Sequence, residues 1–345
     1  MMFPIRNIST STMIFTLFLN LTFVVTPKCE WNQQRATDSL TVRNAHAMAY
    51  DSDRAKVMLF GGADDRSVLG ELWEWDGNNW HKISASGPAP RTFPVMAYDR
   101  DRRRLVLFGG NRVLFGTEND KGTFLDDMWE WDGTRWQTIK AARPSARAEA
   151  SMVYDSARRR LVLFGGYCVV AGKRIRLGDT WEWDGNTWKQ VSTSGPSPRN
   201  GAAMTYDSIR RRVILFGGNG PSGETWTWDG KGWREVKPVV AEGRFNSVMA
   251  FDQARQHVLR FGGWNGEARV GDTWTFDGMA WQQIDAAGPE ARNHAAMVYD
   301  SKRRRLVLFG GHDGERVFGD TWEWDGGKWT RAAFHEPRQR VNNGH

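Results

Sequence analysis

The sequence contains few cysteines and few prolines. Of its 345 residues, two are cysteine (Cys29 and Cys168) and 12 are proline. Two thiols cannot supply a disulfide framework, nor the four Cys/His ligands that a structural zinc ion usually takes. After residue 25 no apolar segment is long enough to span a bilayer. The composition therefore excludes a disulfide-rich mini-domain, a multi-span membrane protein, collagen and a coiled coil.

Tryptophan and glycine, by contrast, are abundant. The chain has 19 tryptophans and 37 glycines, and 40% of its residues are hydrophobic and 25% charged. Because each indole hides a large apolar surface, so many tryptophans indicate many similar burial sites in a soluble globular protein. The formal net charge of +7 permits acidic partners without requiring them.

The N-terminus has the pattern of a targeting segment. An apolar run extends from Met13 to Val25, after a stretch that carries one basic side chain, Arg6, and no acid. A run of this length suits the core of a secretory signal better than a membrane span. We expect residues 1–28 to be a signal peptide, with an uncleaved N-terminal anchor as the alternative. The predicted location is therefore exported: periplasmic, secreted, or anchored to a membrane at the N-terminus.

A repeat governs the chain after residue 40. A Phe-Gly-Gly step occurs six times at spacings of 45 to 56 residues, and each step ends a short apolar run. Upstream of each step lies a segment headed by an arginine. Downstream lies Trp-x-Trp-Asp-Gly-x-x-Trp, which only the fifth unit varies, with Phe276 in the second aromatic place. The six steps begin at Phe60, Phe108, Phe164, Phe216, Phe261 and Phe309.

Each unit has the pattern of four short strands. In the first unit, AHAMAYD and KVMLFGG are apolar runs of strand length, LWEWD alternates with period two, and WHKI begins at the closing tryptophan. The Asp-Gly between the last two runs is a strong hairpin signal. A four-stranded unit repeated at this period is typical of a propeller blade. We predict an all-β, six-bladed β-propeller with four antiparallel strands per blade.

The propeller is expected to occupy residues 29–336, followed by a tail at 337–345. Because every unit already has four strands, Glu30–Ala36 would be a spare outer strand, which we expect near the sixth blade. The six repeats are predicted at about residues 43–90, 91–146, 147–198, 199–243, 244–291 and 292–334.

These units resemble the Kelch repeat. The resemblance rests on the apolar run that ends in Gly-Gly, the acid before the third strand, the paired aromatics and the opening arginine, and it covers residues 31–334. The tight Asp-Gly-x-x-Trp turn is similar to that of secreted bacterial Kelch proteins, whose propeller is described as galactose-oxidase-like. The resemblance implies a propeller that binds partners at one face, but it transfers no partner of the animal Kelch proteins.

Residues that recur in all six units are assigned to the scaffold. The first-strand methionines, such as Met48, lie between small residues, and we expect them to pack between blades rather than to bind copper. If strands alternate in direction, each opening arginine shares a face with the acid before the third strand, which predicts a ring of Arg–carboxylate pairs. At the opposite face we expect solvated hairpin ends rather than a nucleic-acid site. Those ends carry the arginine runs 102–104, 158–160, 210–212 and 303–305.

No catalytic set can be assembled from the sequence. Residues 218–223 match the string GxGxxG, but a strand is predicted to follow, so there is no helix N-terminus to hold a pyrophosphate. Tyr167 and Cys168 are similar to the tyrosine–cysteine pair of galactose oxidase, although the other residues of that copper site are lacking. We therefore expect no cofactor, no metal and no enzymatic activity. A carbohydrate-active enzyme, such as a sugar epimerase or an oxidase-like enzyme, is the alternative.

The non-repeating segments form the candidate binding surface. Those after each Gly-Gly and after each opening arginine mix aromatic, amide and imidazole groups, which suits recognition at one mouth of the central channel. We predict a monomeric, non-catalytic recognition or scaffold module that binds a protein or a glycan there and binds no nucleic acid. The candidate binding residues are Phe93, Asn111, Tyr167, Asn200, Asn219, Phe245, Trp264, Asn293, His294 and His312.

Overall fold

The computed structural model describes residues 40–83, 87–114, 123–218, 223–237 and 242–332. The chain divides into two units, Met1–Thr37 and Asp38–His345, and only the second contains described residues. The expected signal segment, the spare strand Glu30–Ala36 and the tail at 337–345 lie outside them. No helix of the described part is long and apolar enough to cross a membrane.

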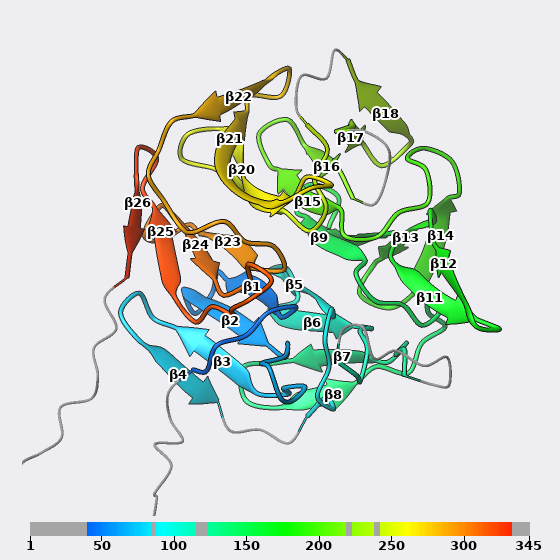
Figure 1. Ribbon diagram of the computed structural model, residues 1–345. Helices are drawn as coiled ribbons and strands as arrows, with labels where there is room; N and C mark the ends of the chain where they lie inside the picture. Colours follow the sequence, from blue (N-terminus) through cyan, green and yellow to red (C-terminus); the bar gives the residue numbers. More distant parts are fainter. Residues whose placement is uncertain (1–39, 84–86, 115–122, 219–222, 238–241, 333–345) are drawn as a thin grey trace, which may run out of the picture. The chain divides into compact units, whose positions relative to one another are not determined.

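Six four-stranded antiparallel sheets form the blades of a propeller, which confirms the predicted fold (Figure 1). Blades 1 and 2 comprise β1 (Ala47–Asp51), β2 (Lys56–Phe60), β3 (Leu72–Trp75), β4 (Trp80–Ile83), β5 (Val95–Asp99), β6 (Arg104–Phe108), β7 (Met128–Trp131) and β8 (Trp136–Thr138). Blades 3 and 4 comprise β9 (Ser151–Asp155), β10 (Arg160–Phe164), β13 (Thr180–Trp183), β14 (Trp188–Ser192), β15 (Ala203–Asp207), β16 (Arg212–Phe216), β17 (Thr225–Trp228) and β18 (Trp233–Val236). Blades 5 and 6 comprise β19 (Val248–Asp252), β20 (His257–Trp264), β21 (Arg269–Phe276), β22 (Trp281–Ile284), β23 (Ala296–Asp300), β24 (Arg305–Phe309), β25 (Thr321–Trp324) and β26 (Trp329–Arg331).

Two features depart from six equal blades. Blade 3 carries an additional two-stranded hairpin after its Gly-Gly step, formed by β11 (Tyr167–Val170) and β12 (Lys173–Arg176). In blade 5, β20 and β21 continue through the Gly-Gly step and pair as far as Trp264 and Arg269. Both segments were expected to be loops of the channel mouth, and their added strand pairing makes the mouth uneven around the axis.

The ring closes directly between the sixth and first blades. The innermost strands β1, β5, β9, β15, β19 and β23 contact one another in turn, and β23 contacts β1. At this junction the indole of Trp80 donates to Thr321 Oγ1 over 2.9 Å, and the Lys302 backbone donates to the hydroxyl of Tyr50 over 3.2 Å. In each described blade the four strands come from one repeat. The ring therefore closes without a strand exchanged between the two ends of the chain.

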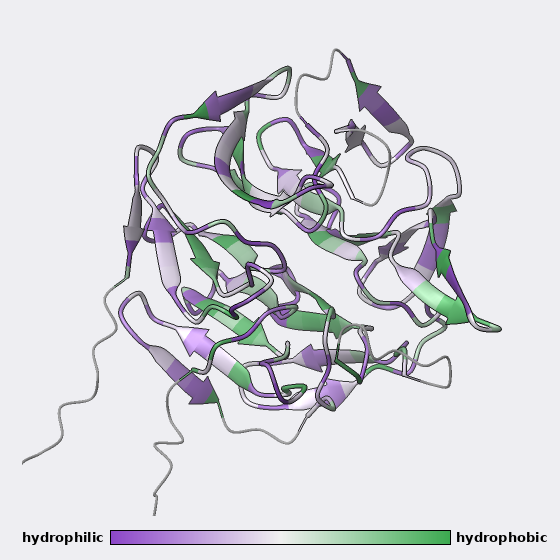
Figure 2. Ribbon diagram, viewed as in Figure 1, coloured by the Kyte–Doolittle hydropathy of each residue, from purple (hydrophilic) through white to green (hydrophobic). Residues whose placement is uncertain are grey.

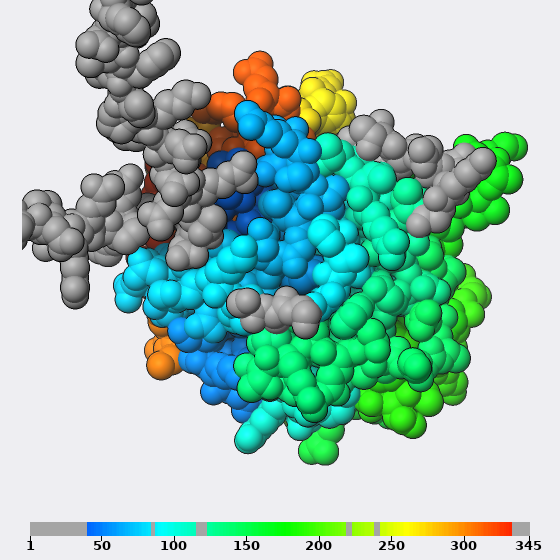
Figure 3. All heavy atoms as spheres, turned by 90° about the horizontal axis from the view of Figure 1, so that it is seen from below, coloured from blue at the N-terminus to red at the C-terminus, as the bar shows by residue number. Residues whose placement is uncertain are grey.

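The hydrophobic core lies between neighbouring blades. Six apolar clusters each combine residues of two adjacent blades, so that Met96 of β5 packs with Met58 of β2, and Met48 of β1 packs with Phe309 of β24. This placement confirms that the first-strand methionines serve inter-blade packing. The outer strands β14, β18 and β22 are the more hydrophilic ones (Figure 2). The first two blades meet in one continuous surface (Figure 3).

The closing tryptophans join each blade to the one before it. Within a blade, Trp228 and Trp233 face each other across the Asp-Gly hairpin, with ring centroids 5.5 Å apart. The Trp233 indole then donates to Thr180 Oγ1 of blade 3 over 2.8 Å. Trp188 instead donates to the sulfur of Met128 in blade 2 over 3.3 Å. The recurring tryptophan therefore supplies both buried area and a directional bond between blades.

Candidate functional site

The double-glycine step holds the loops at one face of the ring. Gly61 and Gly62 have φ of 73° and 91°, in the region that favours glycine. A Cβ on Gly61 would lie 2.7 Å from the carbonyl oxygen of Arg91, and the Gly62 backbone donates to that same oxygen over 2.9 Å. Glycine therefore allows the loop of one blade to touch the opening arginine of the next.

The predicted ring of Arg–carboxylate pairs is confirmed in all six blades. The guanidinium of Arg91 is fully buried and bonds both oxygens of Asp127 and the Gly109 carbonyl. Burial alone would raise the pKa of Asp127, but the bonds and charge of Arg91 hold it below its ordinary value. The pairs are Arg43–Glu71 (3.5 Å), Arg91–Asp127 (2.6 Å), Arg147–Asp179 (2.7 Å), Arg199–Glu224 (2.6 Å), Arg244–Asp272 (2.8 Å) and Arg292–Asp320 (2.6 Å).

The two sets of mouth segments meet in pairs. In each of the following bridges, the residue after an opening arginine pairs antiparallel with the residue after the Gly-Gly step of the same blade. They are Asn44–Ala63, Thr92–Asn111, Ala148–Tyr167, Phe245–Trp264 and Asn293–His312. The structure thus brings together residues that the sequence places about 19 positions apart.

Next to these bridges, one residue per blade forms a ring around the channel, which we call the axial ring. Its members have φ between 50° and 64°, the left-handed region, although only one is glycine. Backbone bonds join neighbours, for example from the amide of Phe93 to the carbonyl of Ala45 over 2.7 Å. A left-handed conformation costs a residue other than glycine about 1–2 kcal/mol, and such strain concentrates at functional sites. The axial ring consists of Ala45, Phe93, Glu149, Gly201, Asn246 and His294.

The axial ring and the residue that follows it in each blade enclose a cavity of about 140 Å³, the axial cavity. The following residues are His46, Pro94, Ala150, Ala202, Ser247 and Ala295. Ala150, Ala202, Asn246 and Ala295 are half-exposed, so the cavity communicates with solvent. This site receives residues from all six blades.

A chain of polar contacts links two residues that line the axial cavity to a third residue of the mouth. Asn246 Nδ2 lies 2.5 Å from His294 Nε2, and His294 Nδ1 lies 2.8 Å from His312 Nε2. Burial, then the charges of His312 and Arg269, lower the pKa of His294 well below its ordinary value, and burial lowers that of His312 to about 4. Both imidazoles are therefore neutral at pH 7, and each carries one donor and one acceptor nitrogen.

A carboxylate completes this polar network. The Asn200 amide donates to Glu149 Oε2 over 2.5 Å, and Glu149 Oε1 lies 3.9 Å from His294 Nε2. Both Glu149 and Asn200 are buried. The Arg176 guanidinium of β12 donates in turn to Asn200 Oδ1 over 3.1 Å, so the additional hairpin of blade 3 is tied to the edge of the cavity.

Comparison with known proteins supplies the family. Residues 16–218, more than half of the chain, match the model of the KLHDC2/KLHL20/DRC7 Kelch-repeats domain. The chain belongs to the Kelch-repeat family. An F-box/kelch-repeat protein of Arabidopsis thaliana is 28% identical over 203 residues, which is 52% of this chain and 39% of that protein.

Two further relatives match shorter shares of their own length. Dynein regulatory complex subunit 7 of Chlamydomonas reinhardtii is 35% identical over 107 residues, 30% of this chain and 8% of that protein. Multiple epidermal growth factor-like domains protein 8 of Homo sapiens is 26% identical over 212 residues, 56% of this chain and 7% of that protein. This Kelch chain spans at most about two-fifths of the length of these relatives.

The ten predicted binding residues occupy different environments in the Kelch ring. Phe93 and His294 line the axial cavity, while Asn200 and His312 bond residues that line it. Phe245 and Trp264 are half-exposed at the mouth. Asn293 is buried and accepts a bond from Arg269 over 3.2 Å. Asn219 lies outside the described residues.

Asn111 and Tyr167 are almost completely buried in local packing. The carboxamide oxygen of Asn111 accepts from the Val113 backbone over 3.3 Å. Tyr167 packs in an apolar cluster with Phe93 and Ala148, with its ring edge-on to that of Phe124. These two side chains shape the wall of the mouth, where they present little surface to a ligand.

Among the polar residues that line the cavity, His46, Asn246 and Ser247 were not predicted. Glu149 stood only among the mouth segments. A signal for His46 and Ser247 exists in the repeat itself, because the same place is Pro94, Ala150, Ala202 or Ala295 in the other units. A polar side chain where the repeat has a small apolar one marks a site-specific role.

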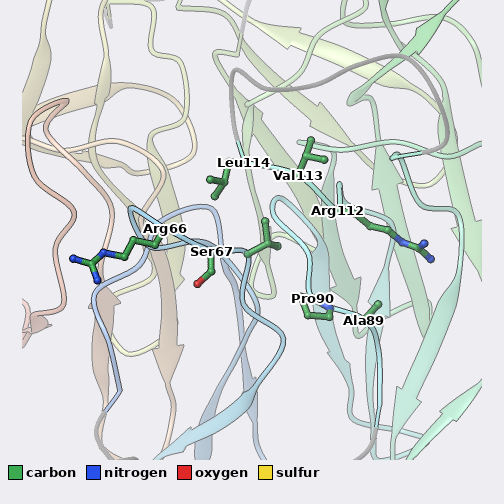
Figure 4. A pocket seen from close by; sticks show the side chains of 8 residues that line it. Arg66, Ser67, Ala89, Pro90, Arg112, Val113 and Leu114 are labelled. Carbon is green, nitrogen blue, oxygen red and sulfur yellow. The ribbon is translucent and has the colours of Figure 1, made fainter. Parts of the chain in front are cut away.

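A larger hollow of about 600 Å³ lies between the loops of blades 1 and 2 (Figure 4). The Arg66 and Arg112 side chains extend away from its middle on opposite sides. None of the residues that line it is buried, in contrast to the buried polar groups of the axial cavity. Within the described ranges, no three His, Cys, Asp or Glu side chains could hold a metal ion. The axial cavity, with its buried polar groups, is therefore the candidate functional site.

Proposed function

We propose that this Kelch propeller is a non-catalytic protein-recognition module whose binding surface is the mouth of the channel. The observation that carries the proposal is the axial ring, where the six blades place six different residue types around one solvent-connected cavity. Varied side chains held at equivalent places of a rigid scaffold are suited to recognition rather than to holding the fold.

The opposite face supports the same choice. Arg102 bonds Asp99 over 2.8 Å and Glu130 over 2.6 Å, so the first arginine of that run is part of the scaffold rather than solvated. The next one, Arg103, is 73% exposed but still lies 3.3 Å from Asp53 of the preceding blade. Because fixed acids offset these charges, the hairpin face offers an incoming acidic partner little uncompensated attraction.

The names of two relatives are consistent with a role in protein assemblies. One is an F-box/kelch-repeat protein, and another is a subunit of the dynein regulatory complex. We carry over from them the general role of a protein-binding propeller and no individual partner. A glycan ligand at the same mouth is the finer alternative.

Site-specific photo-crosslinking tests the choice of face. A benzophenone side chain at Trp264 is expected to capture a partner that the same group at Arg103 does not. The captured protein should bind the wild-type chain in solution, and Trp264→Ala combined with His312→Ala should weaken that binding at least ten-fold. Arg103→Glu combined with Arg159→Glu should leave it within two-fold. If the arginine pair loses binding and the Trp264 and His312 pair keeps it, the partner binds the hairpin face and the proposal is wrong.

An enzyme is the second candidate, and one observation favours it. Glu149 and the neutral His294 stand 3.9 Å apart beside a solvent-connected cavity, a combination that can move a proton. NMR of mixed monosaccharides incubated with the protein would reveal epimerisation as new anomeric signals. Activity that Glu149→Gln abolishes would replace the recognition proposal, and unchanged spectra would retain it.

We also propose that the protein is exported, on the support of the apolar run Met13–Val25 alone. Fractionation of the expressing cells, with N-terminal sequencing of the mature chain, tests this proposal. A chain recovered in the cytosol with Met1 intact contradicts it, whereas an exported chain that keeps Met1 would be the anchored form.

A further inference from the structure

We propose that the axial cavity binds the vicinal hydroxyl groups of a polyol or a sugar, through the side chains of His46 and Ser247. This inference is independent of the protein-recognition function, because free small molecules test it directly. It begins from two buried polar side chains that line the cavity and whose hydrogen-bonding capacity the described residues leave largely unused.

His46 and Ser247 are 6% and 8% exposed, and both line the axial cavity. Within the described part of the chain, neither ring nitrogen of His46 makes a hydrogen bond of ordinary geometry, and the same holds for Ser247 Oγ. A buried polar atom without a partner destabilises the fold, because its bonds to water are lost and not replaced. Alanine occupies this place in three other blades, so the fold does not require a polar group there. The cost is explained if a ligand supplies the missing bonds.

The chemistry of the two side chains selects a neutral ligand group. Burial and the nearby charge of Arg43 lower the pKa of His46 to about 3, although a contact with the Phe309 backbone raises it by a smaller amount. The imidazole is therefore neutral at pH 7 and, like a serine hydroxyl, has both a donor and an acceptor. An ammonium group only donates and a carboxylate only accepts. A hydroxyl group does both and matches each of the two partners.

The arrangement around the axis selects two adjacent hydroxyls. Ser247 belongs to blade 5 and His46 to blade 1, and Ala295 of blade 6 lies between them in the ring order. Ala295 has a small apolar side chain, so no polar group of blade 6 stands between them at this place of the repeat. Among the residues that follow the axial ring, those of the far side, Pro94, Ala150 and Ala202, are apolar. The axial ring adds polar groups to the same lining, but Asn246 and His294 bond each other and Glu149 bonds Asn200. His46 and Ser247 therefore remain as the polar pair for a carbon chain or ring that carries hydroxyls along one edge.

The volume limits how much of the ligand enters. The cavity has a volume of about 140 Å³ and is open to solvent, so it is a small recess at the channel mouth. It suits a glycol unit, such as the end of a polyol or one edge of a sugar ring. The remainder of a glycan would lie in the mouth near Phe245 and Trp264.

Ligand-observed saturation-transfer NMR on the full chain tests the proposal, with glycerol, sorbitol and methyl α-glucopyranoside as probes. At least one of these compounds should bind saturably at millimolar concentration and shift the ring signals of His46 in histidine-labelled protein. 2-Propanol, butylammonium and acetate should not do so. Binding of the glycoside alone would indicate a glycan as the source of the hydroxyls, and binding of glycerol or sorbitol a free polyol.

Two substitutions locate the site. Ser247→Ala installs the residue that other blades already have, so it should fold normally, and it should weaken binding about three- to ten-fold because one neutral hydrogen bond is lost. Ser52→Ala makes the same change at an exposed residue of the first hairpin of blade 1, outside the cavity, and should bind within two-fold of wild type. The proposal is overturned if no diol binds saturably, if Ser247→Ala binds as wild type does, or if butylammonium or acetate binds equally well.

Discussion

Acidification should destabilise this propeller in part through one buried histidine, His46, whose share can be isolated by substitution. Its side chain is 6% exposed, and burial lowers its pKa in the folded state from 6.5 to about 3. In the unfolded chain the imidazole takes up a proton at about pH 6.5. Protonation therefore favours the unfolded state. The contribution of neutral His46 to stability is complete above pH 6.5 and is lost progressively as the pH falls from there toward 3.

The magnitude follows from the two pKa values. At pH 5 the folded imidazole is still neutral, whereas the unfolded one is protonated 1.5 pH units below its pKa. At 1.36 kcal/mol per unit, this difference lowers the free energy of unfolding by about 2 kcal/mol relative to pH 7. In the folded protein, protonation of His46 would place a charge on a side chain that packs edge-on against Phe309, with ring centroids 5.6 Å apart.

Urea unfolding at pH 7 and pH 5 measures this loss. His46→Ala should lose about 2 kcal/mol less than wild type between the two values, because all other titrating groups are common to both proteins. Pro94→Ala, which changes the equivalent residue of blade 2, should keep the wild-type pH dependence. If His46→Ala and wild type lose the same free energy to within 0.5 kcal/mol, His46 titrates in the fold much as it does in the open chain, and the reasoning is refuted.

Three substitutions test the scaffold by denaturant unfolding. Trp188→Ala removes an indole that is 7% exposed and should cost roughly 3–5 kcal/mol, so an unchanged melt would contradict its role between blades. Arg91→Met leaves Asp127 without its buried partner and should cost about 3 kcal/mol, and a loss below 1 kcal/mol would show that the pair contributes little. Gly201→Ala places a Cβ 2.5 Å from Asn246 Oδ1 at a φ of 64° and should cost at least about 1 kcal/mol. Gly232→Ala, whose Cβ meets nothing within 4 Å, is its control, and equal losses in the two glycine variants would reject the steric argument.

The candidate site was predictable only in part. Phe93 and His294 were identified because they belong to segments that differ between repeats, and both line the axial cavity. Tyr167 was identified by the same criterion, yet its ring is buried against Phe124. A variable position reveals that the scaffold does not dictate the residue, but it does not reveal whether the side chain faces a ligand or a neighbouring loop.

The sequence by itself determined the number of blades, the four strands of each and the pairing of Arg91 with Asp127. Those features depend on patterns within one repeat, where strand alternation and a hairpin turn place residues a short distance apart in the chain. Only the tertiary structure decided that His46 and Ser247 line one cavity. They lie 201 positions apart, and their meeting depends on how six blades close around an axis. That closure depends on packing between blades and on the backbone bonds of the axial ring, to which each repeat contributes one left-handed residue. Neither interaction lies within a single repeat.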